Sequence, residues 1–95
     1  MLQLMNTKSR KKEPVPSHDG LVRLYTCGPT VYAFAHIGNF RTFVAEDLLR
    51  RTLRFFGFQV QHVMNLTDVD DKTIKGALAN NVTLDAYTEP FKKAF

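Results

Sequence analysis

The sequence lacks the features of a secreted or membrane-spanning protein. It has one cysteine, Cys27, among 95 residues, so no disulfide can form within the chain. The absence of a disulfide framework is typical of a reducing compartment. The opening MLQLMNTKSRKK has neither the apolar core nor the cleavage site of a signal peptide. No apolar run approaches the roughly 20 residues that a membrane-spanning helix needs. These absences predict a cytoplasmic protein with no membrane segment.

Two common phosphate-binding motifs are also absent. The chain has no G-x-x-x-x-G-K-[ST] sequence, which excludes a P-loop, and no G-x-G-x-x-G sequence after a candidate strand, which excludes the dinucleotide fingerprint. A nucleotide site in this chain would need other groups to hold the phosphates.

The composition is that of an ordinary globular protein. Hydrophobic residues make up 44% and charged residues 23% of the chain. The length allows one small domain at most. The net charge of +4 is compatible with a phosphate-bearing partner but does not identify one.

Residues 1–20 are predicted to be a lead-in segment. A short strand is expected around Leu4, followed by a polar, basic turn over residues 9–12. Pro14 and Pro16 keep the next stretch extended, because proline does not continue a helix.

The following segments alternate between strand and helix patterns. Residues 21–27 are rich in strand-favouring types and predict a buried strand. Apolar residues three to five positions apart predict an amphipathic helix over 40–56, with Gly57 as a left-handed cap. Residues 58–66 alternate as a second strand, with Val63 on the opposite face.

Two more helices are expected after the second strand. Thr67 and Asp68 resemble a helix start, and the pair Asn80–Asn81 ends that helix. Residues 83–95 predict a last helix that Pro90 kinks or splits. The predicted buried residues of the first of these helices are Ile74, Ala77 and Leu78.

The order of elements predicts an α/β fold. A strand, a loop, a helix and a second strand form a βαβ unit, in which the two strands are parallel. Two parallel strands are too few for a complete sheet. We therefore expect half of a nucleotide-binding fold.

The loop between the first strand and the long helix is the candidate site. It runs from Cys27 to Asn39, at the carboxyl end of a parallel strand, where ligands bind in open α/β sheets. The helix that follows offers free N–H groups to phosphates. His36 and Asn39 can donate hydrogen bonds, and Gly38 leaves room for a ligand.

This loop resembles a known family. His36-Ile37-Gly38-Asn39 is similar to the HIGH signature of class I aminoacyl-tRNA synthetases, with Asn39 in place of the final histidine. Three longer segments resemble the cysteinyl-tRNA synthetases within that class: LMNTKSRKKEPV, YTCGPTVYAFAHIGNFRTFVAEDLLRR and LRFFGFQVQHVMNLTDVDDKTIK. The resemblance covers residues 2–77 and implies that residues 1–95 are the amino-terminal part of a Rossmann-like catalytic domain.

The resemblance implies a two-step reaction. Cysteine reacts with ATP, bound with Mg²⁺, to give cysteinyl-adenylate and pyrophosphate, and the acyl group then passes to tRNA(Cys). His36 and Asn39 would contact ATP and stabilise the transition state, with Thr30 and Gly38 also at the ATP. The full-length enzyme is expected to be a monomer, and the 95-residue chain alone to be inactive.

The resemblance also implies a zinc site and a pocket for the substrate cysteine. Cys27 matches a zinc ligand of the family, whose zinc binds the substrate thiolate and selects against serine. The remaining ligands are not in this chain, and neither His18 nor His62 occupies a zinc position. A small buried cysteine at a strand end is the alternative. Gly28 and Thr67 would contact the substrate cysteine, although Thr67 could equally be a helix cap.

Two charged clusters have competing interpretations. Asp68, Asp70 and Asp71 suggest a metal site, but acidic residues at a helix start explain them better. Asp68 could also meet the substrate ammonium. The basic run over residues 10–12 could contact tRNA, but a solvated turn is favoured.

Two other functions stay open. A ligase of the same family that joins cysteine to an amino-sugar would have a similar adenylation site. A non-catalytic nucleotide- or RNA-binding module would explain a chain that contains neither the other zinc ligands nor the family's lysine-rich second signature.

Overall fold

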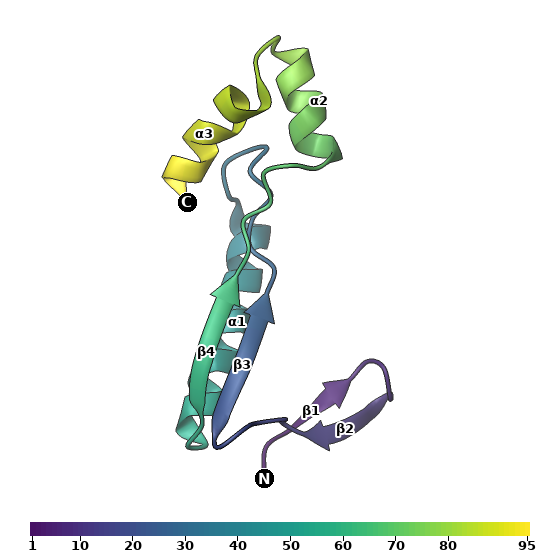
Figure 1. The fold of residues 1–95 in the computed structure, drawn as a ribbon, viewed down its shortest axis with the longest axis vertical. Helices are drawn as coiled ribbons and strands as arrows, with labels where there is room; N and C mark the ends of the chain where they lie inside the picture. The colour runs from purple at the N-terminus through teal and green to yellow at the C-terminus, as the bar shows by residue number, and fades with distance from the viewer.

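The computed structural model describes residues 1–95 and consists of two small sheets and three helices (Figure 1). The strands and helices are β1 (Gln3–Asn6), β2 (Lys11–Pro14), β3 (Leu21–Thr26), α1 (Ile37–Phe55), β4 (Gln59–Met64), α2 (Asp71–Ala79) and α3 (Leu84–Ala94). The helices α2 and α3 lie beyond the carboxyl ends of β3 and β4, and the β1–β2 hairpin lies at the other end of these strands (Figure 1).

The centre of the molecule is the predicted βαβ unit. Strands β3 and β4 pair in parallel, from Leu21 opposite Gln59 to Thr26 opposite Met64, and α1 connects them. The β4 side chains alternate as predicted, with Val63 exposed on the face away from α1. The parallel pair and its connecting helix confirm the α/β prediction.

The end of α1 follows from local sequence. Gly57 has a φ of 89°, a left-handed conformation that glycine adopts without steric cost. The N–H of Gly57 donates to the carbonyl of Arg54, and the N–H of Phe58 donates to that of Leu53. These two bonds form a Schellman motif and confirm the predicted cap.

The lead-in segment is a β-hairpin rather than a strand and a free turn. Strands β1 and β2 pair antiparallel, and the turn between them ends at Arg10, whose φ is 57°. The Glu13 carboxylate accepts hydrogen bonds from Asn6 Nδ2 (2.9 Å) and from the Ser9 hydroxyl, and these bonds lower the pKa of Glu13. The prediction of a basic turn over 9–12 was therefore wrong for its last two residues, which belong to β2.

Helix α2 starts later than the sequence predicts. Its N-cap is Asp70, so the prediction that Thr67 and Asp68 begin the helix was wrong. The buried residues are Thr73 and Ala77. Of the three residues predicted to be buried, Ile74 and Leu78 are 43% and 75% exposed. The C-cap Asn80 lies where the sequence places the end of this helix, and α3 continues through Pro90 as one helix.

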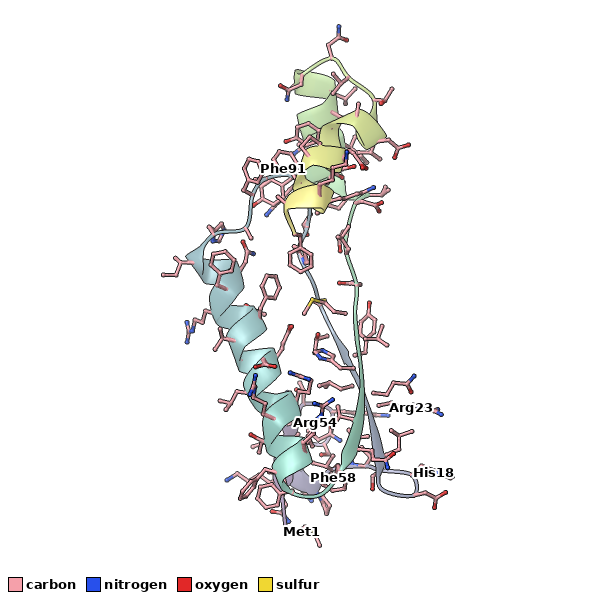
Figure 2. All side chains as sticks on the ribbon, turned by 90° about the vertical axis from the view of Figure 1, so that its left-hand side faces the viewer. Met1, His18, Arg23, Arg54, Phe58 and Phe91 are labelled. Atoms are coloured by element: carbon pink, nitrogen blue, oxygen red, sulfur yellow. The ribbon has the colours of Figure 1, made fainter.

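Much of the apolar surface is uncovered. Only seven of the 95 residues are buried, and the radius of gyration is 17.1 Å, against about 12 Å for a compact chain of this length. Helix α1 covers one face of the β3–β4 pair, while Arg23 lies on the opposite, open side (Figure 2). The prediction that β3 is a buried strand was therefore wrong for all but Val22, because nothing packs on its second face.

Candidate active site

The carboxyl ends of β3 and β4 approach each other closely at Gly28. The backbone N–H of Gly28 donates to Asn65 Oδ1 at 2.6 Å. A Cβ atom at Gly28 would overlap the carbonyl oxygen of Asn65 and lie 2.9 Å from Cγ of Met64. Gly28 is thus needed where the two chain segments meet, which explains this residue without a ligand.

The two predicted site threonines are neighbours. Thr30 and Thr67 form an isolated parallel bridge just beyond the two strands. The N–H of Thr67 donates to the carbonyl of Pro29 (2.9 Å), and the N–H of Val31 donates to the carbonyl of Thr67 (3.0 Å). The interpretation of Thr67 as a helix cap was wrong, because its backbone is used in this bridge and the N-cap of α2 is Asp70, three residues later.

Helix α3 fixes the middle of the loop. The hydroxyl of Tyr87 donates to the backbone carbonyl of Tyr32 at 2.7 Å, across 55 positions of sequence. The ring of Phe34 packs edge-on against Phe91, with the centroids 4.9 Å apart. Figure 2 shows Phe91 on the side of α3 that faces this loop. The loop is thereby held at both of its strand contacts and at α3 before it enters α1.

His36 and Asn39 form a reciprocal capping box at the start of α1. The ring nitrogen Nδ1 of His36 accepts from the N–H of Gly38 (3.1 Å), and Oδ1 of Asn39 accepts from the N–H of His36 (3.0 Å). An Nδ1 atom that accepts carries no proton, so the neutral ring carries its proton on Nε2. The box therefore leaves Nε2–H of His36 and the Nδ2 amide group of Asn39 as donors without a partner in the chain.

The start of α1 is suited to an anion. Its first turn contains no acidic residue, so no side chain neutralises the partial positive charge of the helix start. Gly38 leaves space for the His36 ring, since a Cβ there would lie 2.9 Å from Cε1 and 3.1 Å from Nδ1 of that ring. Gly38 therefore permits the ring orientation that makes the capping box.

A cavity of about 270 Å³ opens beside this helix start. Four of the predicted site residues line it, namely Gly28, Thr30, His36 and Asn39. The lining residues that were not predicted include Tyr32 and Lys72, and Nζ of Lys72 lies 4.8 Å from the centre of the Tyr32 ring. Lys72 carries no local signal of this role, because only the placement of α2 over the loop brings it to the cavity. The other three predicted site residues, Cys27, Gly38 and Thr67, are not among the lining residues.

The three aspartates around the start of α2 have different roles. Asp70 caps α2, and Asp71 lies in its first turn. Asp68 pairs with Lys92 of α3 at 3.0 Å, and this contact lowers the pKa of Asp68 and raises the pKa of Lys92. The helix-start interpretation is therefore confirmed for Asp70 and Asp71, whereas Asp68 lies before the helix and pairs with a lysine of α3.

No group of three histidine, cysteine or acidic side chains in the chain could hold a metal ion. Cys27 is a free thiol and is exposed, so the alternative of a buried cysteine was wrong. His62 is hydrogen-bonded to the hydroxyl of Thr26 (2.8 Å), and exposed His18 lies beside Asp19. The residues of this chain do not themselves make a zinc site.

Comparison with known proteins identifies the fold and the family. Residues 13–95 match the family described as tRNA synthetases class I (C) catalytic domain. The chain belongs to this family. This match confirms the prediction of a Rossmann-like, amino-terminal piece of a class I synthetase. None of the three helices has the length and apolar character needed to cross a membrane.

Similar proteins of this synthetase family carry the name cysteine–tRNA ligase. The chain is 64% identical over 94 residues to the one from Chlamydia caviae and 62% identical over 95 residues to the one from Protochlamydia amoebophila. It is 57% identical over 95 residues to the one from Solibacter usitatus. Each comparison covers 99% of this chain and 20% of the relative, so the chain spans about a fifth of the length of these curated relatives.

Proposed function

We propose that the protein containing this chain is a cysteine–tRNA ligase, which activates cysteine with ATP and transfers it to tRNA(Cys). The observation that carries this proposal is the identity of 62% and 64%, along nearly the whole chain, to relatives of that name. The cavity beside the start of α1 supports it, because it joins a helix start to two side-chain donors that have no partner.

In the activation step, a carboxylate oxygen of cysteine attacks the α-phosphorus of ATP and pyrophosphate leaves with Mg²⁺. Negative charge grows on the phosphate oxygens as this bond forms. Nε2–H of His36 and the Nδ2 amide group of Asn39 donate to those oxygens. Neither side chain needs to reorient, because the capping box holds both in place. Thr30 and Gly38 contact ATP beside them, while Gly28 and Thr67 border the substrate cysteine.

Cys27 is the one residue of this chain that we propose as a zinc ligand. Its thiol is exposed and directly precedes Gly28 of the cavity wall, so a metal bound there would lie next to the site. A zinc ion, completed by ligands from the rest of the protein, would bind the thiolate of the substrate and reject serine. In the purified full-length protein, Cys27→Ser is expected to lower the zinc content, and His18→Gln is expected to leave it unchanged. Equal zinc content in both variants would remove Cys27 from the site.

The test of the function is ATP–pyrophosphate exchange by the purified full-length protein. We expect exchange with cysteine and little with serine, followed by charging of tRNA(Cys). Asn39→Ala is expected to reduce exchange strongly, while Asn80→Ala at the end of α2 changes it little. Absence of exchange with cysteine would overturn the function and leave a non-catalytic binding module. Exchange without tRNA charging, but with cysteine transfer to an amino-sugar, would assign the related ligase.

Location and assembly complete the proposal. We expect a monomeric, cytoplasmic enzyme, in which the rest of the protein covers the open faces of β3, β4 and α1. Light scattering of the full-length protein tests the monomer, and a dimer at micromolar concentration would contradict it.

A further inference from the structure

One cation lines the candidate cavity, and it does not come from the signature loop. Lys72 is the only lysine or arginine among the lining residues, which otherwise contribute neutral donors and apolar groups. It lies on the first turn of α2, beyond the carboxyl ends of the strands (Figure 1), so it reaches the site from a different element than His36 and Asn39.

Lys72 has no acidic partner in the chain. The nearby acids are engaged elsewhere: Asp70 caps α2 through the N–H of Thr73 (2.9 Å), and Asp68 pairs with Lys92 (3.0 Å). Asp71 precedes Lys72 directly, and adjacent helix residues do not face each other. The Lys72 charge is therefore not neutralised by any salt bridge of the molecule.

The ammonium group is held at the cavity by an aromatic ring. Nζ of Lys72 lies 4.8 Å from the centre of Tyr32, and the backbone of Tyr32 is fixed by the hydroxyl of Tyr87. A cation–π contact at an exposed site is weaker than a charge-assisted hydrogen bond to phosphate. The ring can thus hold Nζ near the cavity and lose it to an incoming anion.

We propose that Lys72 binds the triphosphate of ATP and neutralises the departing pyrophosphate. His36 and Asn39 supply directed donors but no charge, whereas ATP brings several negative charges into the cavity. A lysine ammonium is a compact charge that suits phosphate without demanding one geometry. This inference rests on the proposed function, since it assigns Lys72 to the ATP of the activation step.

The test compares three variants of the full-length protein by cysteine-dependent ATP–pyrophosphate exchange. Lys72→Gln is expected to lower kcat/KM for ATP by about 10- to 100-fold, the loss expected for a charge-assisted contact, with the KM for cysteine unchanged. Lys72→Arg keeps the charge and is expected to recover most of the loss. Lys75→Gln, on the same helix but outside the cavity, is the matched control and is expected to stay within about twofold of the parent.

Three results would overturn the inference. Equal kinetics of Lys72→Gln and Lys75→Gln would remove Lys72 from the site. A raised KM for cysteine alone would make Lys72 a carboxylate contact, and a lowered melting temperature with both KM values unchanged would make it structural.

If the parent protein shows no exchange, the proposed function fails separately, and calorimetric titration with Mg²⁺–ATP still tests the role of Lys72. Weaker ATP binding by Lys72→Gln than by Lys75→Gln supports the phosphate contact, and equal binding overturns it.

Discussion

The starts of α1 and α2 are both capped by side chains, but they differ in the donors that each cap leaves free. At α2, Asp70 and Thr73 exchange two bonds of 2.9 Å, and the Thr73 hydroxyl also donates to the carbonyl of Asp70 (3.0 Å). Thr73 is fully buried, so this start is complete within the chain. At α1, Oδ1 of Asn39 accepts from the N–H of His36 (3.0 Å) and Nδ1 of His36 accepts from the N–H of Gly38 (3.1 Å), yet both side chains keep donors without a partner.

The two starts also differ in charge. The cap of α2 is an aspartate, and Asp71 follows in the first turn, which stabilises the helix but repels phosphate. The first turn of α1 contains no acid. The comparison teaches that the cap of α2 uses its side-chain donors within the chain, whereas the cap of α1 leaves side-chain donors free for the ligand that we propose.

The largest expected effect comes from Asn39→Asp, which gives α1 the chemistry of α2. The carboxylate still accepts from the N–H of His36, but the Nδ2 donors are lost and a negative charge faces the phosphate. We expect kcat for exchange to fall by about 10²- to 10³-fold, with the melting temperature kept or slightly raised. The reciprocal change Asp70→Asn preserves the cap of α2 and should stay within about twofold. An active Asn39→Asp enzyme would contradict the role of the donors.

Gly28→Ala tests the close approach of Gly28 and Asn65 at the beginning of the loop that precedes α1. The added methyl group overlaps the carbonyl of Asn65, so the ends of β3 and β4 must separate. We expect a loss of about 1–3 kcal/mol in stability, measured by thermal unfolding and by hydrogen exchange of β3 and β4 amides. Ala33→Ser, at an exposed position of the same loop, is the control. Unchanged protection of both strands would contradict the close approach.

Asp70→Ala tests the closed start. Loss of the acceptor for the N–H of Thr73 should reduce the stability of the first turn of α2 by about 1 kcal/mol. The measurement is hydrogen exchange of the Thr73 amide, which should become faster. The ATP–pyrophosphate exchange activity should fall far less than in Asn39→Asp. A larger loss of activity than in Asn39→Asp would reverse the comparison.

The smallest effect is expected from the partly buried Asp68–Lys92 pair. Because Lys92 lowers the pKa of Asp68, the stabilisation is present above the unfolded pKa of that aspartate and is lost as the pH falls through the lower folded value. The raised pKa of Lys92 works oppositely, since its share is lost as the pH rises through the folded value of the lysine. Melting temperature against pH, in low and high salt, should show an acid dependence that Asp68→Asn reduces slightly, because the carboxylates of Glu13 and Asp47 also have lowered pKa values. An acid dependence in Asp68→Asn equal to that of the parent would contradict the pairing.

Some features could be predicted because their causes are local. Gly57 ends α1 through bonds to the last turn of the same helix, and the alternation of β4 follows from its own side chains. The resemblance of residues 36–39 to a synthetase signature lies in contiguous residues, so the family could be predicted before the fold was known.

Other features depend on distant partners. The sequence at Thr67 resembles a helix start. The backbone of Thr67 instead forms hydrogen bonds with Pro29 and Val31 of the loop, and α2 begins at Asp71. Strand β2 exists because β1 pairs with it. Strand-favouring residues predict a buried strand over residues 21–27, but burial of both faces needs a second layer that this chain does not contain.

The sequence by itself determined the βαβ order, the end of α1 and the family, because each follows from neighbouring residues. Only the tertiary structure decided which donors remain available and which cation joins them. A capping box uses some atoms of His36 and Asn39 and leaves others, which letters alone do not reveal. Lys72 reaches the cavity because α2 packs against α3 and follows the Thr30–Thr67 bridge by only a few residues.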